Sequence, residues 1–226
     1  PFMLAMAIGP KLKWIKSDIE DKIYLILFFV ISLILSVLII RNLDINFLYN
    51  TILITAAFYL FFITLRDFFH RKYRNLSQIT AHFSFSILIL SILFNNIFSS
   101  EVITNLKINE TYQAQNLKIN FESIEQENKQ NFKAIKGKFI VEDQSGLIEV
   151  MQPELRIYNQ PNIVTSEADI KTNIFTDKFM TMNYVQNQDY FNIRYQVKPF
   201  MIWIWISTIL LCLSGCLSLI RKKYEN

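Results

Sequence analysis

Four stretches of this chain are long, apolar and free of charged side chains, and they constrain the fold more than any other feature. They cover residues Ile23–Ile40, Phe47–Leu65, Ile79–Phe98 and Phe200–Ile220. A helix needs about 20 apolar residues to cross a bilayer, and backbone polar groups inside the hydrocarbon must bond to one another. The sequence therefore predicts four transmembrane helices.

The composition agrees with a membrane protein. The chain is 52% hydrophobic and only 19% charged, and its mean hydropathy is +0.25. Soluble domains carry charge on about a quarter of their residues. Its two cysteines, Cys212 and Cys216, both lie in the last apolar run and share one helical face, where we expect small inert side chains. Disordered, collagen-like and disulfide-stabilised folds are excluded.

The basic residues predict how the helices are oriented. Eleven Lys and Arg residues lie in segments 11–22, 66–74 and 221–223, whereas Arg41 alone flanks the loop between the first two runs. Because basic residues concentrate in cytoplasmic loops, we expect these three segments on the cytoplasmic or matrix side. Residues 99–198 then face the periplasm or intermembrane space. The net charge of +4 reflects this topology, so we expect lipid as a partner and no nucleic acid.

The N-terminal stretch Phe2–Ile8 is apolar but too short to span a bilayer. No basic segment precedes it, which argues against a signal peptide. We interpret it as the end of an earlier helix, truncated here and closed by Gly9 and Pro10. This chain is therefore expected to be part of a larger protein.

Residues 99–198 have the alternation of a β-domain. Leu117, Ile119 and Phe121 recur at a period of two, and a second such run spans residues 193–197. The segments Lys138–Glu142 and Leu147–Met151 read as a hairpin around a turn at 143–146. The predicted fold is thus a membrane α-helical bundle (residues 1–98) with a mainly-β domain (99–198) inserted before the last helix and basic tail (199–226).

The two histidines differ in their surroundings. His70 lies among charged residues of an inner loop, where we expect a solvated side chain. His82 lies inside an apolar helix, where an ionisable group is costly and suggests a function. Neutral imidazole is a usual axial ligand of haem. From the residues alone, His82 either ligates a metal or haem, or hydrogen-bonds across helices to Ser84 or Thr55.

A bis-histidine site would need a second imidazole from outside this chain, because His70 is poorly placed to supply it. The sequence has no phosphate-binding loop, no nucleophile–base pair and no carboxylate within a predicted span, so hydrolase and ATPase functions have no support. We predict no catalytic residue in this chain alone.

Several short motifs follow one another along the chain. They are Gly9-Pro10 with Trp14, Ala81-His82, Pro153–Tyr158 (PELRIY), Ser166–Ile170 (SEADI) followed by Asp177, Arg194 with Lys198–Trp205 (KPFMIWIW), and Gly215 with Ser218-Leu219. In this order they resemble the motifs of the CcmF family, the membrane haem lyase component of cytochrome c maturation. The whole chain resembles the C-terminal third of that family.

The resemblance implies a function, a cofactor and partners. It implies a component of a haem lyase that helps attach haem covalently to apocytochrome c and holds a b-type haem, with His82 as one axial ligand. The implied partners are the N-terminal part of the same lyase, a subunit that presents the apocytochrome, a periplasmic haem chaperone and apocytochrome c. The implied location is the bacterial or mitochondrial inner membrane.

The sequence departs from the family pattern in two ways, and two alternative functions remain open. The family's Trp-rich haem-handling motif and its other histidines are absent here, and the glycine after its Ala-His pair is replaced by Phe83. One alternative is a non-enzymatic membrane protein whose β-domain binds a partner, with His82 structural. The other is a small membrane cytochrome that transfers electrons without ligation chemistry.

Overall fold

The computed structural model describes residues 2–9, 23–41, 43, 45–69, 76–114, 117–143, 146–185 and 188–225. The chain divides into two compact units, one formed by Pro1–Ile97 with Met201–Asn226 and the other by Phe98–Phe200. His70, Trp14 and most of the basic segments used for the predicted orientation lie outside the described residues.

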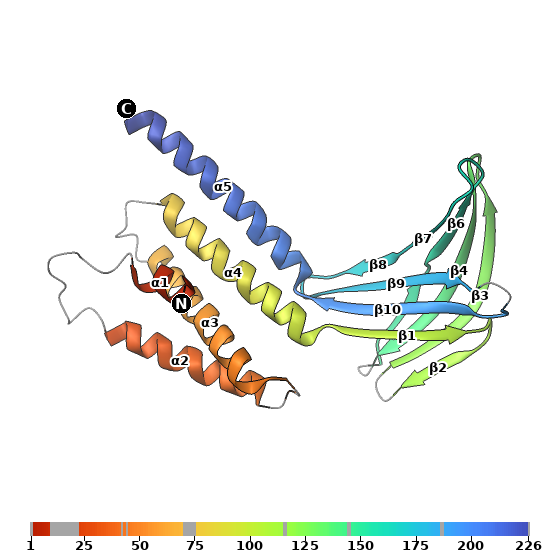
Figure 1. Cartoon of the computed structure of the whole chain (residues 1–226), viewed down its shortest axis with the longest axis horizontal. Helices are drawn as coiled ribbons and strands as arrows, with labels where there is room; N and C mark the ends of the chain where they lie inside the picture. The colour runs from red at the N-terminus through yellow and green to blue at the C-terminus, as the bar shows by residue number, and fades with distance from the viewer. Residues whose placement is uncertain are drawn as a thin grey trace. The chain divides into compact units, whose positions relative to one another are not determined.

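The first unit consists of helices (Figure 1). They are α1 (Phe2–Ile8), α2 (Ile23–Ile40), α3 (Phe47–Phe69), α4 (Leu76–Phe98) and α5 (Met201–Glu225). The helices α2, α3 and α4, and the part Met201–Ile220 of α5, are long and apolar enough to cross a membrane. The four predicted spans are confirmed as helices, and the short N-terminal run is a helix of 7 residues.

Hydrogen bonds of serine and threonine hydroxyl groups connect these helices. Ser36 of α2 and Thr55 of α3 share a hydrogen bond of 2.5 Å between their side-chain oxygens. The hydroxyl of Ser77 in α4 donates to the backbone carbonyl of Ser214 in α5 at 2.7 Å. Lipid offers no hydrophobic drive for helix association, so small polar side chains at close contacts contribute much of the specificity.

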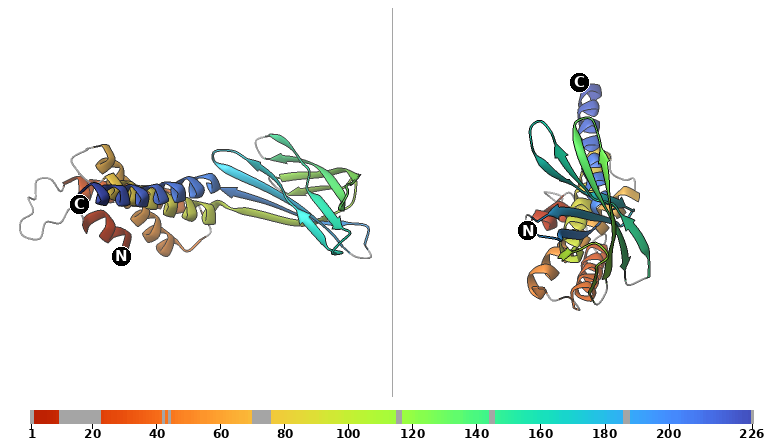
Figure 2. Two further views of the ribbon diagram at one scale, coloured as in Figure 1. Left: turned by 90° about the horizontal axis from the view of Figure 1, so that it is seen from above. Right: turned by 90° about the vertical axis from the view of Figure 1, so that its right-hand side faces the viewer.

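The second unit is a β-sandwich of ten antiparallel strands (Figures 1 and 2). One sheet has the order β1-β10-β9-β8 and comprises Ser100–Leu106, Phe191–Pro199, Thr176–Tyr184 and Asp169–Thr172. The other has the order β2-β3-β4-β6-β7, with β5 paired to β4, and comprises Thr111–Ala114, Leu117–Asn128, Phe132–Asp143, Glu154–Tyr158, Val164–Glu167 and Ile148–Met151.

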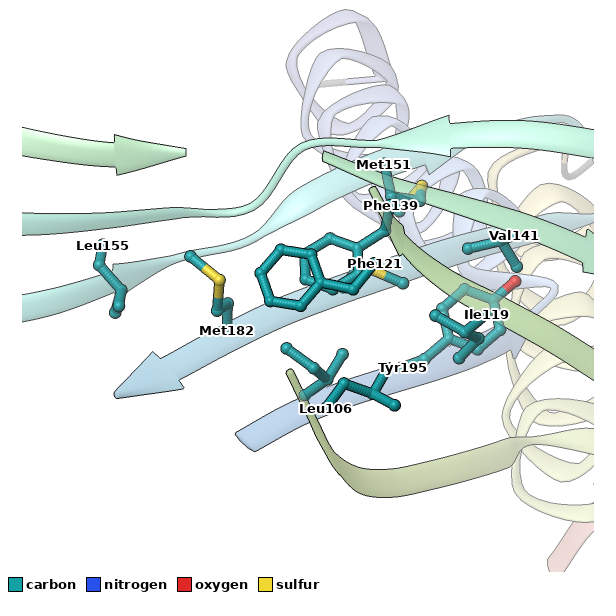
Figure 3. Close-up of a cluster of buried hydrophobic side chains, with 11 residues drawn as sticks. Leu106, Ile119, Phe121, Phe139, Val141, Met151, Leu155, Met182 and Tyr195 are labelled. Atoms are coloured by element: carbon teal, nitrogen blue, oxygen red, sulfur yellow. The ribbon is translucent and has the colours of Figure 1, made fainter. Parts of the chain in front are cut away.

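The core of the sandwich follows the alternation of the strands. Ile119 and Phe121 of β3 and Ile193 of β10 are fully buried, and Tyr195 of β10 is buried as well. The rings of Phe121 and Phe139 stack with centroids 4.3 Å apart at the centre of the cluster (Figure 3). The predicted β-alternation is therefore confirmed, and the inward positions are apolar because each is removed from water on folding.

The predicted hairpin is also present. Ile140 of β4 pairs with Val150 of β5, and Phe139 pairs with Met151. Gly146 takes a positive φ of 75° that favours glycine, and its amide donates to the Asp143 carbonyl at 3.0 Å. The two middle residues of this turn lie outside the described residues.

Candidate functional site

His82 lies in the second turn of α4, and the helix around it is regular. Neither glycine nor proline occurs between Leu76 and Phe98, so nothing in the local sequence interrupts the helical hydrogen bonds. The side chain is partly buried within the helical unit. The regular backbone fixes which side of α4 carries the imidazole.

His82 shares its face of α4 with residues that contact other helices. Phe85 and Ser86 follow it by one turn, and residues so spaced are neighbours on a helix surface. The ring of Phe85 packs edge-on against Phe2 of α1, with centroids 6.1 Å apart. The hydroxyl oxygens of Ser86 and of Thr64 in α3 are 3.5 Å apart. The imidazole therefore belongs to the side of α4 that is turned toward α1 and α3.

The two hydroxyls considered as structural partners of His82 are bonded elsewhere. Ser84 donates within its own helix to the Thr80 carbonyl at 2.7 Å. Thr55 bonds to Ser36. Among the residues that the structure describes, which exclude 70–75 just before α4, we find no hydrogen bond to the His82 imidazole.

Phe83, which stands where the related family has glycine, has a clear packing role. Its ring stacks on Phe61 at 5.7 Å and on Phe68 at 5.9 Å, both in α3. The larger side chain thus fills the contact between α3 and α4 that a glycine would leave to the backbone. Sequence reasoning noted the replacement but could not identify these partners, because they lie on another helix.

His82 is the single His, Cys, Asp or Glu residue of α4. Within the described ranges, no group of three His, Cys, Asp or Glu residues could hold a metal ion together. Cys212 and Cys216 are free, exposed cysteines of α5. His70 lies outside the described residues.

The motif residues of the β-domain form contacts within β6 and with its neighbouring strands. Arg156 of β6 lies 3.1 Å from the Glu154 carboxylate of the same strand and 4.0 Å from the Glu167 carboxylate of β7. Its guanidinium carbon lies 5.2 Å from the centre of the Phe132 ring in β4. Hydrogen bonding to Glu154, followed by Tyr158, raises the pKa of Arg156. These residues therefore join β6 to its neighbours, and nothing in their arrangement is catalytic.

The remaining matched residues of this domain also serve its structure. The Ser166 hydroxyl donates to the Met182 carbonyl at 2.7 Å, which ties the two sheets together. Arg194 of β10 pairs with Glu101 of β1. Its hydrogen bond to Glu101 lowers the pKa of that carboxyl group. Asp177, only 8% exposed, stands opposite Lys198 in the β9–β10 pair.

Comparison with known proteins finds similarity to CcmF proteins, most specifically in the β-domain. Residues 97–199 match the family model described as the CcmF C-terminal beta-sandwich. The chain is 29% identical over 120 residues to cytochrome c-type biogenesis protein ccl1 of Rhodobacter capsulatus, which covers 53% of this chain and 18% of that protein. It is 23% identical over 236 residues to cytochrome c-type biogenesis protein CcmF of Escherichia coli, which covers 100% of this chain and 36% of that protein.

A solved structure gives the same result for the fold. The structure titled Cytochrome c Heme Lyase CcmF matches with a TM-score of 0.70 and 16% sequence identity, over 94% of this chain and 37% of that one. The bundle with a β-sandwich before its last helix is therefore a shared fold. The chain spans between 18% and 36% of the length of the two curated relatives named above.

Proposed function

Since residues 97–199 match the CcmF C-terminal beta-sandwich and the whole chain is similar to part of a CcmF protein, we propose that it is the C-terminal portion of a CcmF-type protein. In this proposal it acts in cytochrome c biogenesis as one part of a membrane haem lyase. Its partners in this function are the N-terminal part of the same lyase, a subunit that presents the apocytochrome, a periplasmic haem chaperone and apocytochrome c. The location is the inner membrane, with residues 99–198 on the periplasmic or intermembrane-space side, as the distribution of basic residues favours.

We further propose that His82 is one axial ligand of a b-type haem. The observation that carries this proposal is the place of the imidazole, on the face of α4 that also holds Phe85 and Ser86 and contacts α1 and α3. The helix that carries it suits a neutral ligand, because α4 contains no Asp, Glu, Lys or Arg. A neutral imidazole provides one nitrogen for the iron and leaves its N–H to be bonded elsewhere.

The residues of this chain would have a positioning function toward that group. The stacking of Phe83 on Phe61 and the contact of Ser86 with Thr64 hold α4 against α3, and so fix the depth and direction of His82. When bound, a b-type haem supplies one-electron transfer. The second axial ligand is a histidine outside this chain.

The experiment is a reduced-minus-oxidised absorption spectrum of the chain co-purified with its N-terminal counterpart. The His82→Ala variant should lose the b-type band and keep its membrane insertion. Gln78→Ala, an exposed polar change one turn earlier on the same helix, is the matched control and should keep the band. Unchanged haem content in the His82→Ala preparation would contradict the ligand assignment.

A second measurement separates the lyase from the alternatives. Cells that lack the chain should fail to accumulate c-type cytochromes if it belongs to a haem lyase. A membrane cytochrome without ligation chemistry would bind haem but leave c-type cytochromes intact. A membrane-anchored β-domain that only binds a partner would hold no haem in the joint preparation.

A further inference from the structure

The end of the β-sandwich at which the chain enters and leaves is tied to the membrane by covalent connection. Ser99 alone separates α4 from β1, and Phe200 alone separates β10 from α5. The strands β1 and β10 are antiparallel neighbours, with Ser100 opposite Val197, so both connections lie at the same end of the sheet. Since α4 and α5 are both long and apolar enough to span a membrane, a bilayer around these helices would border this end of the sheet.

The turn between β8 and β9 lies at this same end. Thr176, the first residue of β9, is opposite Pro199, the last residue of β10. The backbone amide of Phe200 donates to the carbonyl of Phe175 at 2.6 Å. Phe175 is therefore hydrogen-bonded to the residue that directly precedes a membrane-spanning helix.

The turn is fixed by its own hydrogen bonds. The side-chain oxygen of Asn173 accepts from the amides of Phe175 at 2.8 Å and Thr176 at 2.7 Å. The Asn173 amide donates in turn to the Thr176 carbonyl at 2.9 Å. Asparagine closes turns in this way because its short side chain can imitate a backbone acceptor. The bonds leave the two intervening side chains directed outward.

Those two side chains are large, apolar and exposed. Ile174 is 61% exposed and Phe175 is 62% exposed, and the turn from Asn173 to Thr176 contains no charged residue. The sequence that connects β9 to β10, at the opposite end of the same sheet, is VQNQDY and is polar at four of its six positions. Adjacent large apolar side chains on a rigid turn mark a contact surface, whereas a turn in water is ordinarily polar.

We propose that the β8–β9 turn inserts Ile174 and Phe175 into the boundary between the lipid headgroups and the acyl chains, and so anchors the β-domain to the membrane surface. Apolar and aromatic side chains favour this boundary, where they can be buried about 5–10 Å deep. We take lipid as the occupant of this surface because the adjacent helix, from Met201 to Ile220, is long and apolar enough to span a membrane. This inference does not depend on haem or on His82.

The test places an environment-sensitive fluorophore on the turn of the full chain in phosphatidylcholine vesicles. The background carries Cys212→Ser and Cys216→Ser, because both cysteines are exposed. The fluorophore NBD is attached to Phe175→Cys or, as the matched control, to Tyr184→Cys. Tyr184 is 57% exposed at the other end of β9.

We expect blue-shifted emission at position 175 and about a twofold loss of that emission when the vesicles contain lipid with a nitroxide near the headgroup, at the depth of interfacial insertion. Position 184 should emit as in water and lose little emission. A blue shift at 175 without quenching by the nitroxide lipid would mean that protein covers the turn, and it would overturn the proposal.

A second labelling position controls for the possibility that replacing Phe175 disturbs the turn. Ile174→Cys leaves Phe175 in place and should give the same shift and quenching. Water-like emission at both 174 and 175 would overturn the proposal, provided the Asn173 turn keeps the hydrogen-exchange protection of the unmodified chain.

Discussion

The ammonium group of Lys178 on β9 lies 2.8 Å from the carboxylate of Glu149 on β5, so an ion pair joins the two sheets of the sandwich. A second carboxylate, that of Asp143 at the end of β4, lies 3.6 Å from the same ammonium group. The Lys178 side chain is only 12% exposed, and it lies on the same face of β9 as the core residues Met180 and Met182. The cation therefore points inward, at the end of the sandwich nearest the membrane connections.

We expect Lys178→Ala to lower the free energy of unfolding of the β-domain by about 2–3 kcal/mol, because it leaves two partly buried carboxylates without their cation. Hydrogen exchange of the β9 and β10 amides in the intact membrane protein measures this change. The control is Lys171→Ala, whose ammonium lies 3.8 Å from Asp169 on a side chain that is 50% exposed. If the two variants lose equal free energies of unfolding, the ion pair of Lys178 does not stabilise the β-domain more than an exposed one.

The same carboxylates act on Tyr195, a core residue of β10. Burial, and then the negative charges of Glu149 and Asp143, raise the pKa of this phenol from 10.0 to about 12. The folded state therefore holds the proton more tightly than the unfolded state. The resulting stabilisation is complete below pH 10 and is lost as the pH rises from 10 to 12. Its size is about 2–3 kcal/mol.

Thermal unfolding of the β-domain across this pH range checks the prediction. The wild-type chain should lose more stability between pH 10 and pH 12 than Tyr195→Phe, whose ring remains but has no proton to release. Comparison of the two chains isolates this phenol from the other tyrosines and from the lysines that titrate nearby. Parallel losses in both would show that Tyr195 ionises as an ordinary exposed tyrosine.

The membrane helices could be predicted from sequence because lipid leaves the backbone no other regular choice. Their ends could not. The second apolar run stops at Leu65, yet α3 continues to Phe69, beyond the charged Arg66 and Asp67. The Arg66 guanidinium lies 3.6 Å from the centre of the Tyr24 ring, which stabilises a cation at the end of the span. A partner more than 40 residues away in the sequence carries no local signal.

The β-domain shows the same limit. Long strands such as β3 were visible as alternation, but β7 and β8 have only 4 residues each and lie at the edges of the two sheets, where polar residues are tolerated. His82 was visible because an ionisable residue in an apolar run is unusual. Thr64 and Phe2 contact the residues that share the helix face of His82, and they could not be identified from the sequence because they lie on α3 and α1.

Gly137 in β4 tests how tightly the sandwich core is packed. A Cβ atom at this position would lie 2.5 Å from Cε2 of Phe139 and 2.8 Å from Sδ of Met182, and both side chains are fully buried. We expect Gly137→Ala to destabilise the β-domain by about 1–3 kcal/mol through overpacking. The measurement is the hydrogen exchange of the β-domain amides at increasing concentrations of denaturant, which gives the free energy of unfolding.

The matched control for that change is Gly215→Ala in α5. A Cβ atom there meets nothing within 4 Å, and alanine favours helix over glycine by about 1 kcal/mol. We therefore expect Gly137→Ala to lower the free energy of unfolding of the β-domain and Gly215→Ala to raise that of the helical unit. A neutral Gly137→Ala would mean that Phe139 and Met182 can move aside without cost.

The hydrogen bond between Ser36 and Thr55 should contribute measurably to the pairing of α2 with α3. Both side chains are buried, with Ser36 at 0% and Thr55 at 5% exposure, and their oxygens are 2.5 Å apart. We expect a double-mutant cycle of Ser36→Ala and Thr55→Val to give a coupling free energy of about 0.5–1.5 kcal/mol, the range found for such bonds between membrane helices. Reversible unfolding in mixed micelles gives the free energies of unfolding of the wild-type chain, the two single variants and the double variant.

A second cycle is the control for this prediction. It pairs Ser36→Ala with Thr208→Ala, whose hydroxyl donates within α5 to the Ile204 carbonyl at 2.8 Å, and it should give no coupling. Equal coupling in the two cycles would show that the effect arises from helix propensity and not from the bond between the helices.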